Sequence, residues 1–292
     1  MDEIRVRYWD AVWWMLSKGE NLRRLSGLAV LVLLAGAALS TGAYGQGVTA
    51  PTDAELAAIT ERGRMLEDYD QAAWHATDAL QTANPKTVEG QHYIAKKENG
   101  RWRVAFGALD AGKSKFLIAY EAEQLAKPKE FSVKRDEPAK VDEGFYLFAA
   151  RALVLALADF GPAARPYNVA VLPAEPGATN GQEGLFVYLY PGQTRASIYP
   201  LGGDARYLVS ADGTKILAKR QMHKSVIESR PPKGKKVEAG FHTHVLSDVP
   251  EDTDVLHVLQ QDPPVPEFVS TAHFLFEILA NGTIQVKKTR KN

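Results

Sequence analysis

The 292-residue sequence contains no cysteine. This absence excludes disulfide bonds, thiol catalysis and cysteine-ligated zinc sites, so the fold must be held together by its core. An excess of charge of one sign is absent too, because 35 Lys and Arg residues balance 35 Asp and Glu residues. A balanced chain has no overall field that favours nucleic acid or an anionic membrane surface. We therefore expect no nucleic-acid partner.

Long hydrophobic runs are also scarce. The apolar run at 25–39 is short for a membrane-spanning helix, which needs about 20 apolar residues. Basic residues precede this run, and the small residues Ala43 and Gly45 follow it at the −3 and −1 positions of a cleavage site before Gln46. A basic flank, an apolar run and small residues in this order are typical of a secretory signal sequence.

This pattern predicts a leader and signal sequence at 1–45 and a mature protein that is periplasmic or secreted, with no stable membrane span after processing. The alternative is an uncleaved inner-membrane anchor. The leader before the signal is unusually rich in tryptophan, and Met15 begins a segment with more ordinary signal proportions. Translation from Met15 rather than Met1 is therefore an open hypothesis.

The first part of the predicted mature chain, 46–143, is expected to be a helical and three-stranded subdomain. Thr52 and Glu55 have capping-box spacing, and apolar residues recur at helical spacing after them, which predicts one long or two short helices over 51–83. Residues 91–123 alternate between apolar and polar types, with turn residues such as Asn99-Gly100 between the alternating runs. They predict a small antiparallel meander.

The charged segment 124–142 contains two prolines and is predicted to be a linker or long loop. Residues 144–160 are apolar nearly all round and predict a buried helix. Short strand-like segments and turn residues follow, and 144–292 is expected to form a mostly antiparallel sheet domain. The predicted strands are 167–172, 184–190, 205–210, 215–219, 237–245, 271–278 and 283–288, with a helical turn at 223–229. The whole pattern predicts an α+β fold.

One cluster of residues suggests chemistry. His242 and His244 are two residues apart on a predicted strand, so both side chains should lie on the same face. The loop that follows supplies four carboxylates, at Asp248, Glu251, Asp252 and Asp254. Two histidines and one carboxylate are a common zinc ligand set, and they leave one position open for water. The sequence therefore predicts a zinc site here.

The run from His242 to Asp254 resembles the metal motif of the JAB/MPN (JAMM) metalloprotease superfamily, in which His-x-His is followed by Ser-x-x-Asp. The resemblance implies a JAB/MPN-like fold and zinc held by His242, His244 and Asp254. It also implies a glutamate that activates water, for which Glu183 at the head of a predicted strand is the best match and Glu228 a weaker one. The spacing is one residue short and the serine position is acidic, so the motif is degenerate.

Two functions follow as hypotheses. The first is an exported envelope protein that acts as a zinc-dependent amide or isopeptide hydrolase. The alternative is a non-catalytic envelope binding or scaffold protein with a degenerate JAB/MPN-like fold. In either case the expected partner is an envelope peptide or protein of unknown identity. The remaining candidates His223, His257 and His273 are scattered along the sequence. His257 follows Asp254 by three residues, which permits a shared helical face, and His273 is expected to be a packing residue of a strand.

Overall fold

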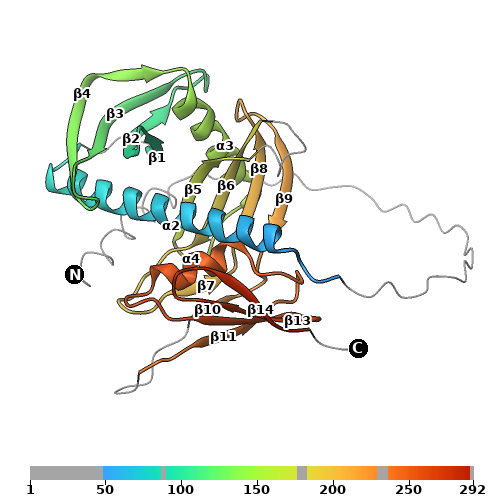
Figure 1. The fold of residues 1–292 in the computed structure, drawn as a ribbon. Coiled ribbons are helices and arrows are strands. Elements are labelled where there is room, and N and C mark those ends of the chain that lie inside the picture. Colours follow the sequence, from blue (N-terminus) through green and yellow to red (C-terminus); the bar gives the residue numbers. More distant parts are fainter. Residues whose placement is uncertain (1–48, 87–89, 176–182, 229–235, 290–292) are drawn as a thin grey trace, which may run out of the picture.

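The computed structural model describes residues 49–86, 90–175, 183–228 and 236–289. The predicted leader and signal sequence at 1–45 lie outside these residues. Within the described ranges, no helix is both long enough and apolar enough to cross a membrane. The described residues form three helices and fourteen strands in mostly antiparallel sheets (Figure 1), which confirms the predicted α+β class.

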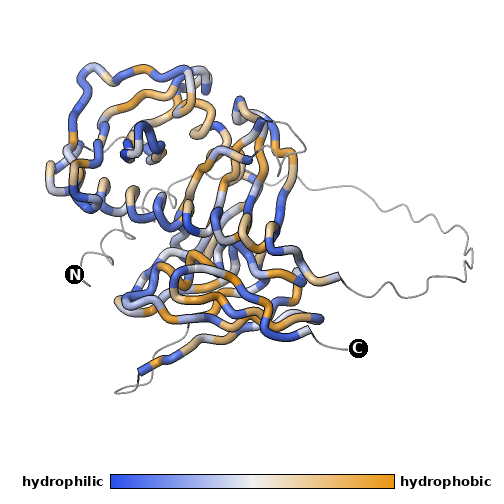
Figure 2. Tube along the Cα trace, in the orientation of Figure 1, coloured by the Kyte–Doolittle hydropathy of each residue, from blue (hydrophilic) through white to orange (hydrophobic). Residues whose placement is uncertain are grey.

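The long helix α2 (Asp53–Thr82) begins where the sequence predicts. The Glu55 backbone N–H donates to the Thr52 hydroxyl at 3.2 Å, and the Thr52 N–H donates to the Glu55 carboxylate at 2.7 Å. This reciprocal capping box satisfies two backbone donors that the first turn would otherwise leave unpaired. Hydrophilic and hydrophobic residues alternate along the helix (Figure 2), so α2 can pack against several elements at once.

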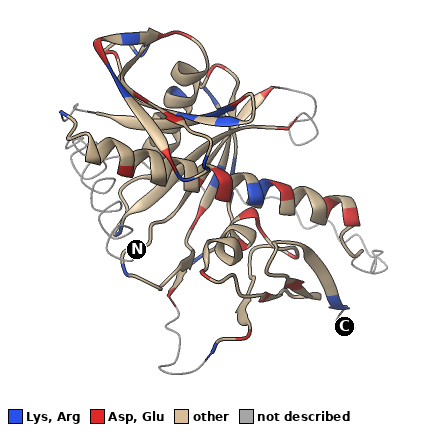
Figure 3. Cartoon of the chain, turned by 60° about the vertical axis from the view of Figure 1, so that its left-hand side comes forward, with Lys and Arg blue, Asp and Glu red and all other residues tan. Residues whose placement is uncertain are grey.

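The first sheet is a meander of β1 (His92–Glu98), β2 (Arg101–Leu109), β3 (Phe116–Gln124) and β4 (Phe131–Asp142). The first three strands confirm the sequence prediction. The linker predicted at 124–142 is wrong, because most of this segment is β4. Charged residues of both signs lie along this mostly exposed edge strand (Figure 3), and a register irregularity opposite Ile118–Tyr120 takes up the segment around Pro138. Edge strands tolerate both features.

The buried helix α3 (Phe145–Phe160) is present as predicted and ends before Gly161. A second antiparallel sheet follows, in the order β5 (Tyr167–Pro173), β6 (Gly184–Pro191), β8 (Ala205–Ser210) and β9 (Ile216–Gln221). One large hydrophobic core is shared by α2, α3 and both of these sheets. That core includes residues on both sides of position 143, and the division into 46–143 and 144–292 stays a prediction.

The third layer carries the remaining strands. β7 (Pro200–Gly202) pairs with β10 (Val226–Glu228), so the helical turn predicted at 223–229 is wrong. β11 (Gly240–Thr243) is an edge strand that pairs in parallel with β12 (Glu267–Ser270), followed by β13 (Phe274–Ile278) and β14 (Ile284–Thr289). Helix α4 (Asp252–Gln260), which the sequence reading missed, connects the parallel pair as such pairs require.

Helix α2 joins this third layer to the rest of the molecule. Its first turns contribute Leu56 and Ile59 to a second hydrophobic core with α4 and β12–β14, whereas its later turns belong to the large core. The two helices approach closely at Gly63, where a Cβ atom would lie 2.4 Å from the Cβ of Val255. Glycine is therefore needed at this crossing, and α4 is fixed firmly against α2.

Candidate metal centre

Strand β11 determines the direction of the two histidines that the sequence singles out. His242 lies within the strand, and the His244 N–H continues the pairing by donating to the Ser270 carbonyl at 2.8 Å. Alternate side chains of a strand share a face, and the Nε2 atoms of His242 and His244 accordingly lie 3.1 Å apart. The predicted pairing of these two imidazoles is confirmed.

Helix α4 supplies the carboxylate. Asp254 lies in the first turn, and its Oδ2 accepts a hydrogen bond of 2.7 Å from the backbone N–H of Glu251. The partial positive charge of the helix N-terminus favours an ionised carboxylate at this position. Asp254 Oδ1 lies 3.2 Å from His242 Nε2, and Oδ2 lies 3.1 Å from His244 Nε2.

His223 completes the cluster from a third segment. It follows β9 by two residues, and its Nε2 lies 2.9 Å from His244 Nε2 and 3.0 Å from Asp254 Oδ1. The four ligand atoms all lie within 4.8 Å of one another, an arrangement that can hold a metal ion. The side chains are between 0 and 8% exposed, so the centre is buried.

Each histidine is oriented by a bond from its other ring nitrogen. His223 Nδ1 lies 2.8 Å from Asp204 Oδ1, and His242 Nδ1 lies 2.8 Å from Glu267 Oε1. His244 Nδ1 lies 3.0 Å from the Val249 carbonyl. All three partners are acceptors, so each Nδ1 carries the hydrogen and each neutral ring presents a bare Nε2. Outer partners of this kind fix the tautomer and the ring orientation of metal-ligating histidines.

This assignment has an electrostatic consequence. Three Nε2 lone pairs and the Asp254 carboxylate face one another at about 3 Å, and no hydrogen is available between them in the neutral tautomers. Asp254 Oδ1 is buried and has no hydrogen-bond donor within the part of the chain that the structure describes. Converging acceptors repel unless a cation lies between them. A metal ion or added protons must therefore neutralise the centre.

The pKa values describe the proton-loaded form of the site. Burial opposes charge on His223, but the carboxylates of Asp254 and Asp204 outweigh it and raise the pKa to about 11. Burial opposes charge on His242 as well, and Asp254 and Glu267 raise its pKa to about 9. Burial disfavours the charged form of Asp254, yet His223 and His244 hold its pKa well below the usual range. Protons and a metal ion compete for the same lone pairs.

The distances match a small first-row metal ion. Four contacts that join the three Nε2 atoms and Asp254 Oδ1 measure 2.9, 3.1, 3.0 and 3.2 Å. A tetrahedron with edges of about 3.1 Å has its centre about 1.9 Å from each corner, close to the Zn–N distance of about 2.0–2.1 Å. The side between His223 and His242 is the wider one, because their ring centroids lie 5.8 Å apart against 4.6 and 5.1 Å for the other two ring pairs.

The structure does not bring Glu183 to this cluster. Glu183 precedes β6 at the end where Gly184 pairs with Ser210, whereas Asp204 and His223 lie beyond the opposite end of the sheet. Six strand residues separate these ends by about 20 Å. The weaker candidate Glu228 instead forms an ion pair of 2.6 Å with Arg165.

Sequence reasoning missed His223 as a ligand and both carboxylates that orient the rings. A local signal for His223 was its place just after a predicted strand, but nothing in the sequence indicates which other strand end it meets. His273 is also outside the cluster and pairs with Asp248 at 2.8 Å. His257 shares α4 with Asp254, and burial lowers its pKa.

Comparisons of the chain with family models, with curated proteins and with solved structures find no match. The resemblance of the His242–Asp254 segment to the JAB/MPN metal motif is neither strengthened nor weakened by this result, and it stays a prediction. What the centre can do follows from its own side chains.

Proposed function

We propose that the protein binds one zinc ion through His223, His242, His244 and Asp254. The observation that supports this proposal is the convergence of three histidine Nε2 atoms and a carboxylate oxygen, which all lie within 4.8 Å of one another in a buried centre. Nitrogen and oxygen ligands at about tetrahedral separation are typical of zinc, whereas magnesium and calcium prefer a shell made of oxygen atoms.

The best-supported role for this zinc is structural. Four protein ligands fill a tetrahedral shell, as in structural sites, and they come from the segment after β9, from β11 and from α4. Among the described residues, the carboxylates around the centre already have partners: Asp204 and Glu267 bind histidines, and Glu251 binds Arg220. This arrangement leaves no obvious carboxylate to act as a general base.

The protein is accordingly proposed to be an exported envelope binding or scaffold protein in which zinc stabilises the third layer. Its export rests on the predicted signal sequence. A zinc-dependent amide or isopeptide hydrolase is the second candidate. Two observations favour it: the ligand set is His and Asp only, as in many catalytic zinc sites, and the side between His223 and His242 is wider than the others.

Metal content is the first test. We expect about one zinc per full chain by mass spectrometry, and none in the His242→Ala/His244→Ala double variant, because two of four ligands are lost. His273→Ala is the matched control. This histidine lies outside the centre, so the variant should retain zinc. If neither wild type nor variant takes up zinc when it is supplied, the proposed centre does not exist.

An activity assay separates the two roles. A structural zinc predicts that zinc-loaded wild type cleaves peptide and cell-wall amide bonds no faster than the double variant. Zinc-dependent cleavage by wild type, lost in the variant, would establish the hydrolase and end the structural proposal.

A substitution at Gly240 tests more selectively whether Glu267 orients His242 for metal binding. A Cβ atom at Gly240 would lie 1.7 Å from Glu267 Oε2, so Gly240→Ala must push this carboxylate away from His242 Nδ1. Losing an outer partner of this kind lowers metal affinity by about 10- to 100-fold. We expect that decrease in a competition titration against a chromogenic chelator.

The control for this variant is Gly112→Ala. A Cβ atom there meets nothing closer than 3.5 Å, in an exposed turn far from the centre. Zinc affinity should be unchanged. Equal affinity of Gly240→Ala and wild type would mean that Glu267 does not orient a zinc ligand.

A further inference from the structure

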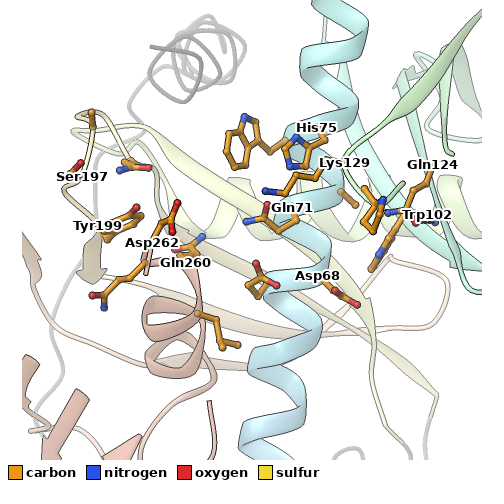
Figure 4. A pocket seen from close by; sticks show the side chains of 18 residues that line it. Asp68, Gln71, His75, Trp102, Gln124, Lys129, Ser197, Tyr199, Gln260 and Asp262 are labelled. Carbon is orange, nitrogen blue, oxygen red and sulfur yellow. Dashed lines mark hydrogen bonds between the residues drawn. The ribbon is translucent and has the colours of Figure 1, made fainter. Parts of the chain in front are cut away.

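A second candidate site lies away from the metal centre, beside α2. It is a cavity of about 440 Å³, within the range of about 300–1,000 Å³ usual for small-molecule pockets. Figure 4 shows side chains from the first sheet, from α2, from the loop before β7 and from the end of α4 around one space. Four separate parts of the fold therefore build this pocket.

One side of the pocket is a face of α2. Asp68, Gln71 and His75 lie at positions i, i+3 and i+7, so they follow one side of the helix for about 10 Å. Trp74 also lines the cavity and is half-buried, with its ring stacked on His75 at 4.6 Å between centroids. This side is long enough for an elongated ligand and mixes polar and aromatic groups.

The two other sides of the pocket also combine polar and aromatic groups. Trp102, Gln124 and Lys129 come from the first sheet and its β3–β4 connection, while Tyr199 and Gln260 come from the opposite side (Figure 4). Some of these groups are held in place by the protein. The Gln124 carboxamide accepts from the backbone N–H of Trp102 at 3.2 Å and donates to the Pro128 carbonyl at 2.8 Å, and Gln260 donates to Asp70 at 2.9 Å.

Other polar groups in the pocket remain available to a ligand. The side chains of Gln71, Lys129, Ser197 and Asp262 make no hydrogen bond or ion pair with any other described residue. Together they offer a carboxamide, an ammonium group, a hydroxyl and a carboxylate, and so both donors and acceptors. Apolar lining dominates most drug-like pockets, and this one differs by its high polar content.

We propose that this pocket binds an oligosaccharide. Hydroxyl groups of a sugar both donate and accept hydrogen bonds, as the carboxamides, Ser197 and Asp262 require, while the C–H faces of sugar rings pack on indole and phenol rings. Polyanionic ligands are disfavoured, because Glu67 and Asp262 outnumber Lys129 in the lining and Asp68 is already paired with Lys97 at 2.8 Å. Lys129 and Asp262 are exposed, and exposed single charges contribute little to binding free energy. A zwitterionic ligand would therefore gain little affinity from pairing with them.

This site is independent of the zinc proposal. None of the four candidate metal ligands lines the pocket, and the sugar contacts would be made by groups of α2 and its neighbours. An oligosaccharide-binding protein of the envelope would result whether or not the buried centre holds metal.

The test is calorimetric titration of the full chain with linear tetramers of N-acetylglucosamine and of glucose. We expect at least one tetramer to bind with a dissociation constant of about 1 mM or tighter. Trp74→Ala should weaken binding at least tenfold, through loss of ring stacking, and Gln71→Ala several-fold. If Trp74→Ala fails to fold, the several-fold loss expected for Gln71→Ala decides the test in its place.

Gln285→Ala is the matched control for Gln71→Ala, since Gln285 is exposed on β14 and does not line the pocket. Its affinity should equal that of wild type. The proposal is overturned if neither tetramer binds to the folded wild type, if the pocket variants bind as tightly as Gln285→Ala, or if a polyamine such as spermine binds in the place of both sugars.

Discussion

Removal of zinc by a chelator is expected to lower the melting temperature of the protein by about 10 °C. Only the folded chain brings His223, His242, His244 and Asp254 together, so zinc binds the native state alone. A ligand present at about a thousand times its dissociation constant stabilises a fold by about 4 kcal/mol. For a chain of this size, each kcal/mol shifts the melting temperature by about 2–4 °C.

The measurement is a thermal scan of the zinc-loaded protein with and without chelator. The His242→Ala/His244→Ala variant should melt near the temperature of chelated wild type and should not respond to chelator, because it has no site to lose. His273→Ala should behave as wild type does, since its imidazole pairs with Asp248 instead. Adding zinc back should restore the wild-type melting temperature. Melting curves of wild type that coincide in zinc and in chelator would rule out a structural metal.

The sequence predicts half of this centre well. The pairing of His242 with His244 needs only the two-residue period of a strand, which is a local property. Asp254 was found through a motif resemblance, although it reaches the histidines from the first turn of α4, a helix that sequence periodicity did not indicate. The first turn of α4 buries Asp252, Thr253 and Asp254, so its polar residues look like an exposed loop.

The missing half depends on contacts between distant segments. His223 meets His244 because β9 ends beside Asp204, and that pairing of strands has no signature near residue 223. Glu183 was preferred because it heads a strand, but the register of β6 with β8 places it at the wrong end. Burial also misled the reading of β4, whose charged residues suggest a linker when they belong to an exposed edge strand.

Substitution of Asp252, which lies next to the centre, should destabilise the fold more than most single substitutions. Its carboxylate is 1% exposed and binds three groups: Arg62 Nε at 3.0 Å, the Tyr188 hydroxyl at 2.9 Å and the Arg206 guanidinium. These partners come from α2, β6 and β8, so a single side chain connects α4 to the long helix and to two strands of the second sheet.

Asp252→Ala would leave two largely buried guanidinium groups without their carboxylate. Breaking a buried ion pair by removing one partner costs about 3–5 kcal/mol, because the remaining charge stays desolvated. We expect a decrease in melting temperature of about 10 °C in zinc-loaded protein. The matched control is Asp68→Ala, whose carboxylate and whose partner Lys97 are both about half exposed, and which should melt close to wild type.

The losses of stability caused by zinc removal and by Asp252→Ala should also be coupled. Asp252 and Asp254 stand two residues apart in the first turn of α4, one tied to the arginines and the other to the histidines. If zinc fixes this turn, its removal already loosens the geometry on which the Asp252 network depends. Asp252→Ala should then cost less in chelated protein than in zinc-loaded protein, with an interaction energy of about 0.5–3 kcal/mol. Strictly additive losses, measured by denaturant unfolding of the four combinations, would show that the centre does not position α4.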